Sequence, residues 1–162
     1  MKKSSTIFLR VVVVLIGIVA LAIMIRFPLT EGRATNLDLL SIYADPFIIY
    51  GYVASISFFV ALYQAFKLLG YIGQNKVFSL SSVKALRTIK QCAIILSASI
   101  VMAGLYIRIF HAEGDGGDDP AGFLAICIVT TFVSIVVATA AAVFEKTLQS
   151  AVDLKSENDL TV

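Results

Sequence analysis

The only histidine of this 162-residue chain lies in a segment that also carries four carboxylates. The residues are His111, Glu113, Asp115, Asp118 and Asp119, separated mainly by glycine. Carboxylate oxygens on a glycine-rich loop are what Ca²⁺ requires, so these five residues are weak candidates for a metal site. Their spacing does not follow the EF-hand pattern, and a solvated acidic turn explains the same residues. We expect the solvated turn, with no metal and no other cofactor.

The two cysteines and the remaining polar residues do not indicate an enzyme. Cys92 and Cys127 fall at different depths of two apolar stretches, roughly 10 Å apart, which is too far for a disulfide. We expect both to be small buried side chains in helix packing. With one histidine, no nucleophile and base converge, so we predict no catalytic residues and no enzymatic activity.

The densest charge cluster is basic and lies in the middle of the chain. It consists of Lys67, Lys76, Lys84, Arg87 and Lys90, with no acidic residue between the first and the last. One interpretation is contact with anionic lipid head groups or with a protein partner. The other is topological anchoring, in which long basic side chains extend to the membrane interface. The residue types fit both interpretations.

Four apolar stretches must position these residues. The chain is 59% hydrophobic and 15% charged, where soluble domains average about 25% charged residues. A helix needs about 20 apolar residues to cross the hydrocarbon core, and four stretches meet that length. The pattern predicts an all-α integral membrane four-helix bundle, with residues 1–162 as a single domain. The expected spans are about 7–29, 46–70, 88–109 and 121–146, with a middle loop at 71–87.

Local signals place several helix ends. Pro46 fits the first turn of the second span, and the helical pattern of that span breaks after Gly73. A serine cap predicts that the third helix starts near Ser81 and enters the membrane without a break. Leu37–Tyr43 fits a short amphipathic helix at the outer interface, and the fourth helix is expected to continue to about Lys155.

The charge distribution predicts the threading. With both termini and the middle loop on one side, that side holds ten Lys and Arg against four acids, and the other side holds three against seven. By the positive-inside rule, both termini lie in the cytoplasm of a multi-pass membrane protein. The first stretch is expected to be a retained helix, because it is long for a signal peptide and lacks an A-x-A-like site before Pro28.

Charged residues within the spans are confined to the span ends. They are Arg10, Arg26, Lys67, Arg108 and Glu145, which can reach the interface by extending. An ion-coupled carrier is expected to hold charge at membrane depth, so this distribution disfavours one. The third and fourth spans are rich in Ser, Ala and Gly, and small residues let helices approach closely in lipid. We expect these two helices to pack tightly together.

Three segments resemble a known family. The middle of the chain reads ALYQAFKLLGYI at 61–72, NKVFS at 75–79 and SVKALRTIK at 82–90, and the tail 148–162 reads LQSAVDLKSENDLTV. These strings resemble the YoaS-like family of small bacterial membrane proteins. The resemblance implies a four-span, multi-pass protein of the bacterial cytoplasmic membrane, of uncharacterised function and commonly encoded beside a small helix-turn-helix regulator. It implies no catalytic or binding residues.

The sequence thus predicts a non-enzymatic membrane protein that senses or signals through its basic loop and tail. Its expected partners are membrane lipids and, by resemblance, the helix-turn-helix regulator, with no direct nucleic acid binding. A homo-oligomer is an open alternative. The second functional hypothesis is a small transporter, channel or immunity-type protein for membrane-active compounds. A polar cavity between the helices, lined by Ser57, Gln64, Ser99 and Thr131, would favour that hypothesis, and a dry, close-packed core would exclude it.

Overall fold

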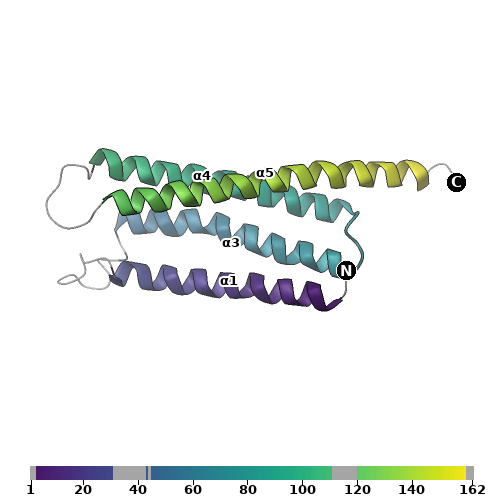
Figure 1. Cartoon of the computed structure of the whole chain (residues 1–162), viewed down its shortest axis with the longest axis horizontal. Coiled ribbons are helices and arrows are strands. Elements are labelled where there is room, and N and C mark those ends of the chain that lie inside the picture. The colour runs from purple at the N-terminus through teal and green to yellow at the C-terminus, as the bar shows by residue number, and fades with distance from the viewer. Residues whose placement is uncertain (1–2, 31–42, 44, 111–119, 160–162) are drawn as a thin grey trace.

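The computed structural model describes residues 3–30, 43, 45–110 and 120–159. They form the helices α1 (Lys3–Thr30), α3 (Pro46–Gly73), α4 (Leu80–Phe110) and α5 (Pro120–Asp159), shown in Figure 1. All four are long and apolar enough to cross a membrane, which confirms the predicted all-α membrane architecture. The short helix expected at Leu37–Tyr43 falls, apart from its last residue, outside the described part of the chain.

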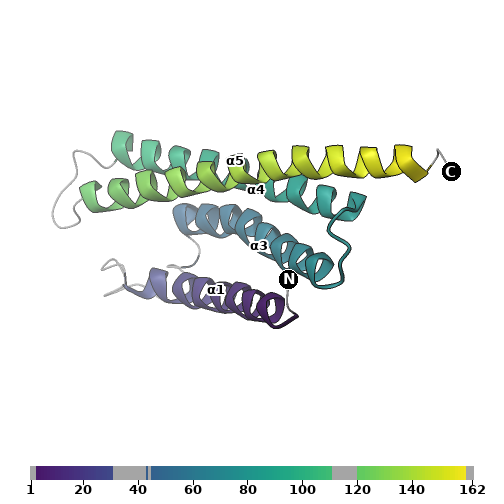
Figure 2. The ribbon, with the colours of Figure 1, turned by 45° about the vertical axis from the view of Figure 1, so that its right-hand side comes forward.

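The helices pack mainly in chain order. α1 packs on α3, α3 on α4, and α4 on α5, and the contact between α4 and α5 is the most extensive. Figures 1 and 2 show α1 at the outside of the bundle and α3 between it and the α4–α5 pair. The tight α4–α5 packing confirms the prediction from small residues: the buried small side chains of α5 are Cys127, Ser134, Ala138 and Ala141.

Both ends of the chain and the α3–α4 turn lie at one end of the bundle, on the right in Figure 1. We call this the basic end, because it carries Lys76, Lys84, Arg87 and Lys90. Placement of the termini and the middle loop together agrees with the predicted threading. That the basic end faces the cytoplasm stays a prediction of the positive-inside rule.

The turn into α3 forms as its sequence predicts. Asp45 is the N-cap, and its Oδ1 accepts a hydrogen bond of 2.8 Å from the backbone N–H of Phe47. Pro46 occupies the first turn, where its missing N–H costs nothing because the first donors of a helix have no partner within the helix. The two residues fix the point at which the chain enters the second span.

The turn between α3 and α4 is short and covers residues 74–79. α3 ends at Gly73, and Asn75 takes a left-handed conformation with φ of 56°, which asparagine tolerates better than most residues. Ser79 then caps α4, since its Oγ accepts from the N–H of Ser82 at 3.3 Å. The cap lies two residues before the predicted Ser81, and α4 continues into its apolar part without a break.

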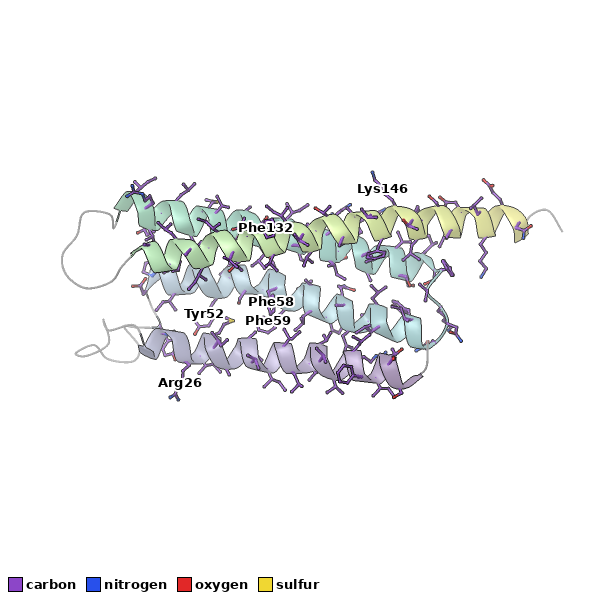
Figure 3. The ribbon with its side chains drawn as sticks, viewed as in Figure 1. Arg26, Tyr52, Phe58, Phe59, Phe132 and Lys146 are labelled. Atoms are coloured by element: carbon purple, nitrogen blue, oxygen red, sulfur yellow. The ribbon has the colours of Figure 1, made fainter. Side chains whose placement is uncertain are left out.

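A tyrosine hydroxyl replaces the backbone hydrogen bond that is lost at the proline inside α1. Pro28 has no N–H, so the carbonyl of Met24 loses the donor it would have in a regular helix. The hydroxyl of Tyr52 on α3 donates to this carbonyl at 3.0 Å, and the hydroxyl of Tyr43 donates to the carbonyl of Ile25 at 3.2 Å. The two tyrosines thereby hold this end of α1, and Figure 3 shows Tyr52 between α1 and α3.

The apolar core is densest at the basic end. Leu86 and Ile89 of α4 and Ala141 of α5 form a buried cluster, against which α3 packs with Ala65 and Leu68. Three helices therefore meet here. α5 continues well beyond this cluster: its 40 residues extend for about 60 Å, twice the thickness of the hydrocarbon core. It projects past the ends of α3 and α4 in both ribbon views (Figures 1 and 2).

Candidate functional site at the basic end

A buried carboxylate joins α4 to α5 next to the apolar cluster. Oε1 of Glu145 lies 2.8 Å from Nε of Arg87, and Oε2 lies 2.6 Å from Nζ of Lys90. Arg87 and Lys90 are three residues apart on α4, so they share one face of that helix. Each carboxylate oxygen of Glu145 therefore has its own cation. We call these three residues the Glu145 cluster.

Burial makes the Glu145 cluster stronger than an ordinary surface ion pair. Glu145 is 8% exposed, while the side chains of Lys90 and Arg87 are 29% and 57% exposed. A charge removed from water to this extent is stable only when it is paired and hydrogen-bonded, which both contacts achieve. With two cations and one anion, the cluster keeps one net positive charge at the membrane edge.

The sequence placed Glu145 at a span end with its side chain extending to the interface, and the inward orientation is a correction. The helical spacing contained the signal. Ala138 and Ala141 are buried on α5, and a residue four positions after Ala141 lies on the same face. Leu148, a further three positions along, also packs toward the core. A carboxylate on a stripe of small and apolar residues indicates an interhelical contact.

The structure divides the five predicted contact residues into two groups. Arg87 and Lys90 are held by Glu145. Lys67, Lys76 and Lys84 are exposed, and Nζ of Lys67 lies 5.4 Å from the ring centre of Tyr63 on its own helix. The sequence treated all five as one surface. Part of the cluster instead serves helix packing, and the exposed lysines are the ones free to meet lipid or a partner.

An open pocket lies between the α3–α4 turn and the projecting part of α5. Its volume is about 620 Å³. The lining residues are Asn75, Lys76, Phe78, Ser79, Ala151 and Lys155. The turn contributes one lysine and α5 the other, and Phe78 is 60% exposed beside them. Two ammonium groups and an exposed aromatic ring fit an acidic segment that also carries apolar side chains.

The remaining candidates from the sequence are the acidic segment and the two cysteines. His111, Glu113, Asp115, Asp118 and Asp119 all lie outside the described residues. Within the described ranges, no three His, Cys, Asp or Glu side chains gather as metal ligands would. Cys92 and Cys127 are buried free thiols, so the prediction that they form no disulfide is confirmed.

The polar residues of the spans mostly bond to their own helices. The hydroxyl of Ser99 donates to the carbonyl of Ile95, and the hydroxyl of Ser134 donates to that of Thr130. Of the two pockets described, one is at the basic end and the other is an apolar groove along α1. Neither is lined by Ser57, Gln64, Ser99 or Thr131, the residues that a transport cavity would require.

Four helices long and apolar enough to span a membrane, packed in chain order with a charged cluster between the last two, define a helical multi-pass membrane protein. The chain belongs to a family described as "protein of unknown function (DUF2975)", whose model matches residues 5–162. It is 46% identical over 164 residues to the uncharacterized membrane protein YoaS of Bacillus subtilis (strain 168), with 100% of both chains covered. The resemblance seen in the middle loop and tail is thereby confirmed. No solved structure matches the chain.

Proposed function

We propose that this protein is a non-enzymatic membrane protein that signals to a cytoplasmic protein partner. The partner would dock on residues that line the pocket at the basic end, namely the exposed Lys76, Phe78 and Lys155 and the half-buried Ala151, which we call the partner surface. The observation that carries the proposal is the projection of α5 past the α3–α4 turn, since it creates a pocket from two separate elements. A helix that only had to cross the membrane could end near residue 146, where the predicted fourth span ends, but α5 continues to Asp159.

The Glu145 cluster supports a mechanical connection between the spans and this surface. It fixes α5 to α4 two helical turns before Ala151, the first α5 residue of the partner surface. α3 reaches the same surface directly through the turn that contains Lys76. A shift of one span relative to another would therefore change the distance between Lys76 and Lys155. A bound partner would respond to such a change.

The chemistry of the partner surface favours an acidic partner. Its two lysines come from different elements, and Asp153, the nearest acid before Lys155, bonds to Gln149 on its own helix. The helix-turn-helix regulator implied by the family resemblance is the first partner to test. In this proposal the regulator, and not the membrane protein, would contact nucleic acid.

Photo-cross-linking in cells tests the proposal. A photoreactive amino acid replaces Phe78, and a matched control places it at Phe132, an exposed aromatic in the middle of the α5 span (Figure 3). We expect a protein adduct from position 78 and lipid adducts from position 132. The double variant Lys76→Glu/Lys155→Glu should abolish the protein adduct, because it reverses the charge of the surface.

Two results would contradict the proposal. One is recovery of lipid alone from position 78, which would leave the basic end with an anchoring role. The other is an adduct that persists at full yield in the double variant, since binding would then not depend on the lysines. An adduct between two copies of this chain would show that the surface binds a second copy and would contradict docking of the regulator.

A further inference from the structure

A second cation at the basic end has its own packing arrangement. Arg10, in the third turn of α1, turns toward α3, and its guanidinium carbon lies 4.9 Å from the ring centre of Phe66. Gly70, one turn further along α3, is buried, and a Cβ there would overlap the guanidinium. The missing side chain of Gly70 therefore makes the space that Arg10 occupies. The sequence placed Arg10 among the side chains that extend freely to the interface, and this is a second correction.

This charge has no acid partner within the described residues. Both ion pairs found there involve Glu145, and Nε of Arg10 is buried with no hydrogen-bond partner. Thr6 lies one turn earlier on the same face of α1 and packs against Gly73. It is 3% exposed, and its hydroxyl is also without a partner. Thr6 is thus buried between α1 and α3 with an unpaired hydroxyl. The half-buried Arg10 beside it has the Phe66 ring against its charge and a buried Nε without an acceptor, which is costly unless a ligand supplies one.

The surroundings of Arg10 indicate what kind of ligand reaches it. The neighbouring α1 residues Ile7, Phe8 and Val11 are exposed and apolar, so this part of α1 faces acyl chains. Arg10 is three residues inside the predicted start of the first span, about 5 Å, so its long side chain is within reach of the lipid head groups. Guanidinium binds phosphate through two parallel hydrogen bonds, and phosphate is the anion present at this level. A soluble acidic protein would have to displace lipid to reach the same position.

We propose that Arg10, with the Thr6 hydroxyl beside it, binds the phosphate of an anionic phospholipid in the seam between α1 and α3. Gly70 and Gly73 leave the room that the two side chains need. None of these residues belongs to the partner surface, so the lipid site and the signalling function can fail separately.

Lipid retention measured by native mass spectrometry tests the site. The full chain is purified in a mild detergent, and phosphatidylglycerol or phosphatidylcholine is added over a concentration series. Arg10→Gln should weaken phosphatidylglycerol binding about tenfold, the effect of losing one charge-assisted contact. Arg26→Gln is the matched control, because Arg26 is an exposed arginine at the other end of the same helix and points away from the bundle (Figure 3). It should change binding less than about twofold.

Two further variants separate binding from folding. Thr6→Val keeps the shape of the side chain and removes its hydroxyl, and we expect a smaller loss of phosphatidylglycerol with an unchanged melting temperature. Arg10→Lys keeps the charge and removes the two-pronged donor, and it should restore only part of the affinity. Equal losses in Arg10→Gln and Arg26→Gln would overturn the site. Competition by millimolar inorganic phosphate would keep the phosphate chemistry but overturn the lipid source.

Discussion

Neutralising Glu145 should weaken the bundle more than any other single charge change at the basic end. Glu145→Gln preserves the size of the side chain and leaves Arg87 and Lys90 facing each other's charge without an anion between them. Removing one partner of a fully buried ion pair costs about 3–5 kcal/mol, and an exposed pair contributes about 0.2–1 kcal/mol. The Glu145 cluster lies between these limits, because its acid is buried and its cations are partly exposed.

The two contacts can be assigned different magnitudes from their exposure. Lys90 is 29% exposed, so we expect a coupling energy with Glu145 of about 2 kcal/mol. Arg87 is 57% exposed and screened by solvent, which reduces its expected coupling to roughly 1 kcal/mol. The shorter and more buried contact therefore decides how firmly α5 is held on α4. The order of the two values is a sharper test than their sum.

Double-mutant cycles measure both couplings. Each cycle compares the unfolding of the wild type, the two single variants and the double variant in mixed detergent micelles, followed by circular dichroism. The double variants are Lys90→Ala/Glu145→Ala and Arg87→Ala/Glu145→Ala. Asp153→Asn is the control, since this exposed acid contacts only its own helix among the described residues, and it should change stability by less than about 0.5 kcal/mol. Coupling near zero in both cycles, or a loss in Asp153→Asn equal to that of the Glu145 variant, would refute this reasoning.

Three further predictions concern the spans. Tyr52→Phe should destabilise the protein by about 1–3 kcal/mol in a micelle unfolding assay, because the Met24 carbonyl would lose the donor that replaces the missing proline N–H; an unchanged stability would mean that another donor substitutes. Gly104→Ala should be tolerated, because a Cβ there meets Cys127 at an ordinary 3.7 Å, whereas Gly104→Leu should separate α4 from α5 and lower the melting temperature; equal stability of the two variants would contradict close packing here. A phosphatase reporter that is active only outside the cytoplasm should be inactive when fused to the C-terminus, and activity there would reverse the predicted threading.

The membrane fold could be read from the sequence because its strongest determinants are local. Apolar stretches of sufficient length make spanning helices whatever their neighbours are, and Pro46 and Gly73 mark helix ends through backbone properties of their own. The close approach of α4 and α5 was also predictable, because both helices are rich in small residues and small side chains let two helices pack closely in lipid.

The inward positions of Glu145 and Arg10 were not predicted. Hydropathy gives the depth of a residue in the membrane, but the direction in which its side chain points depends on which neighbouring helix lies beside that face. The space for Arg10 exists because Gly70 of another helix is opposite, and the attraction on Glu145 comes from α4. Both contacts join residues more than 50 positions apart, so no local pattern identifies the partner; the spacing of Glu145 from Ala138 and Ala141 indicates only that its side chain faces inward.

Packing in chain order has a consequence for the biogenesis of the protein. Each helix that leaves the ribosome finds its main packing partner already in the membrane, because that partner was synthesised just before it. The Glu145 cluster follows the same order, since Arg87 and Lys90 are inserted with α4 and their anion arrives with α5. Insertion of the last helix therefore neutralises charge as well as burying surface, and a nascent chain that stops after α4 is left with two adjacent cations that lack their carboxylate.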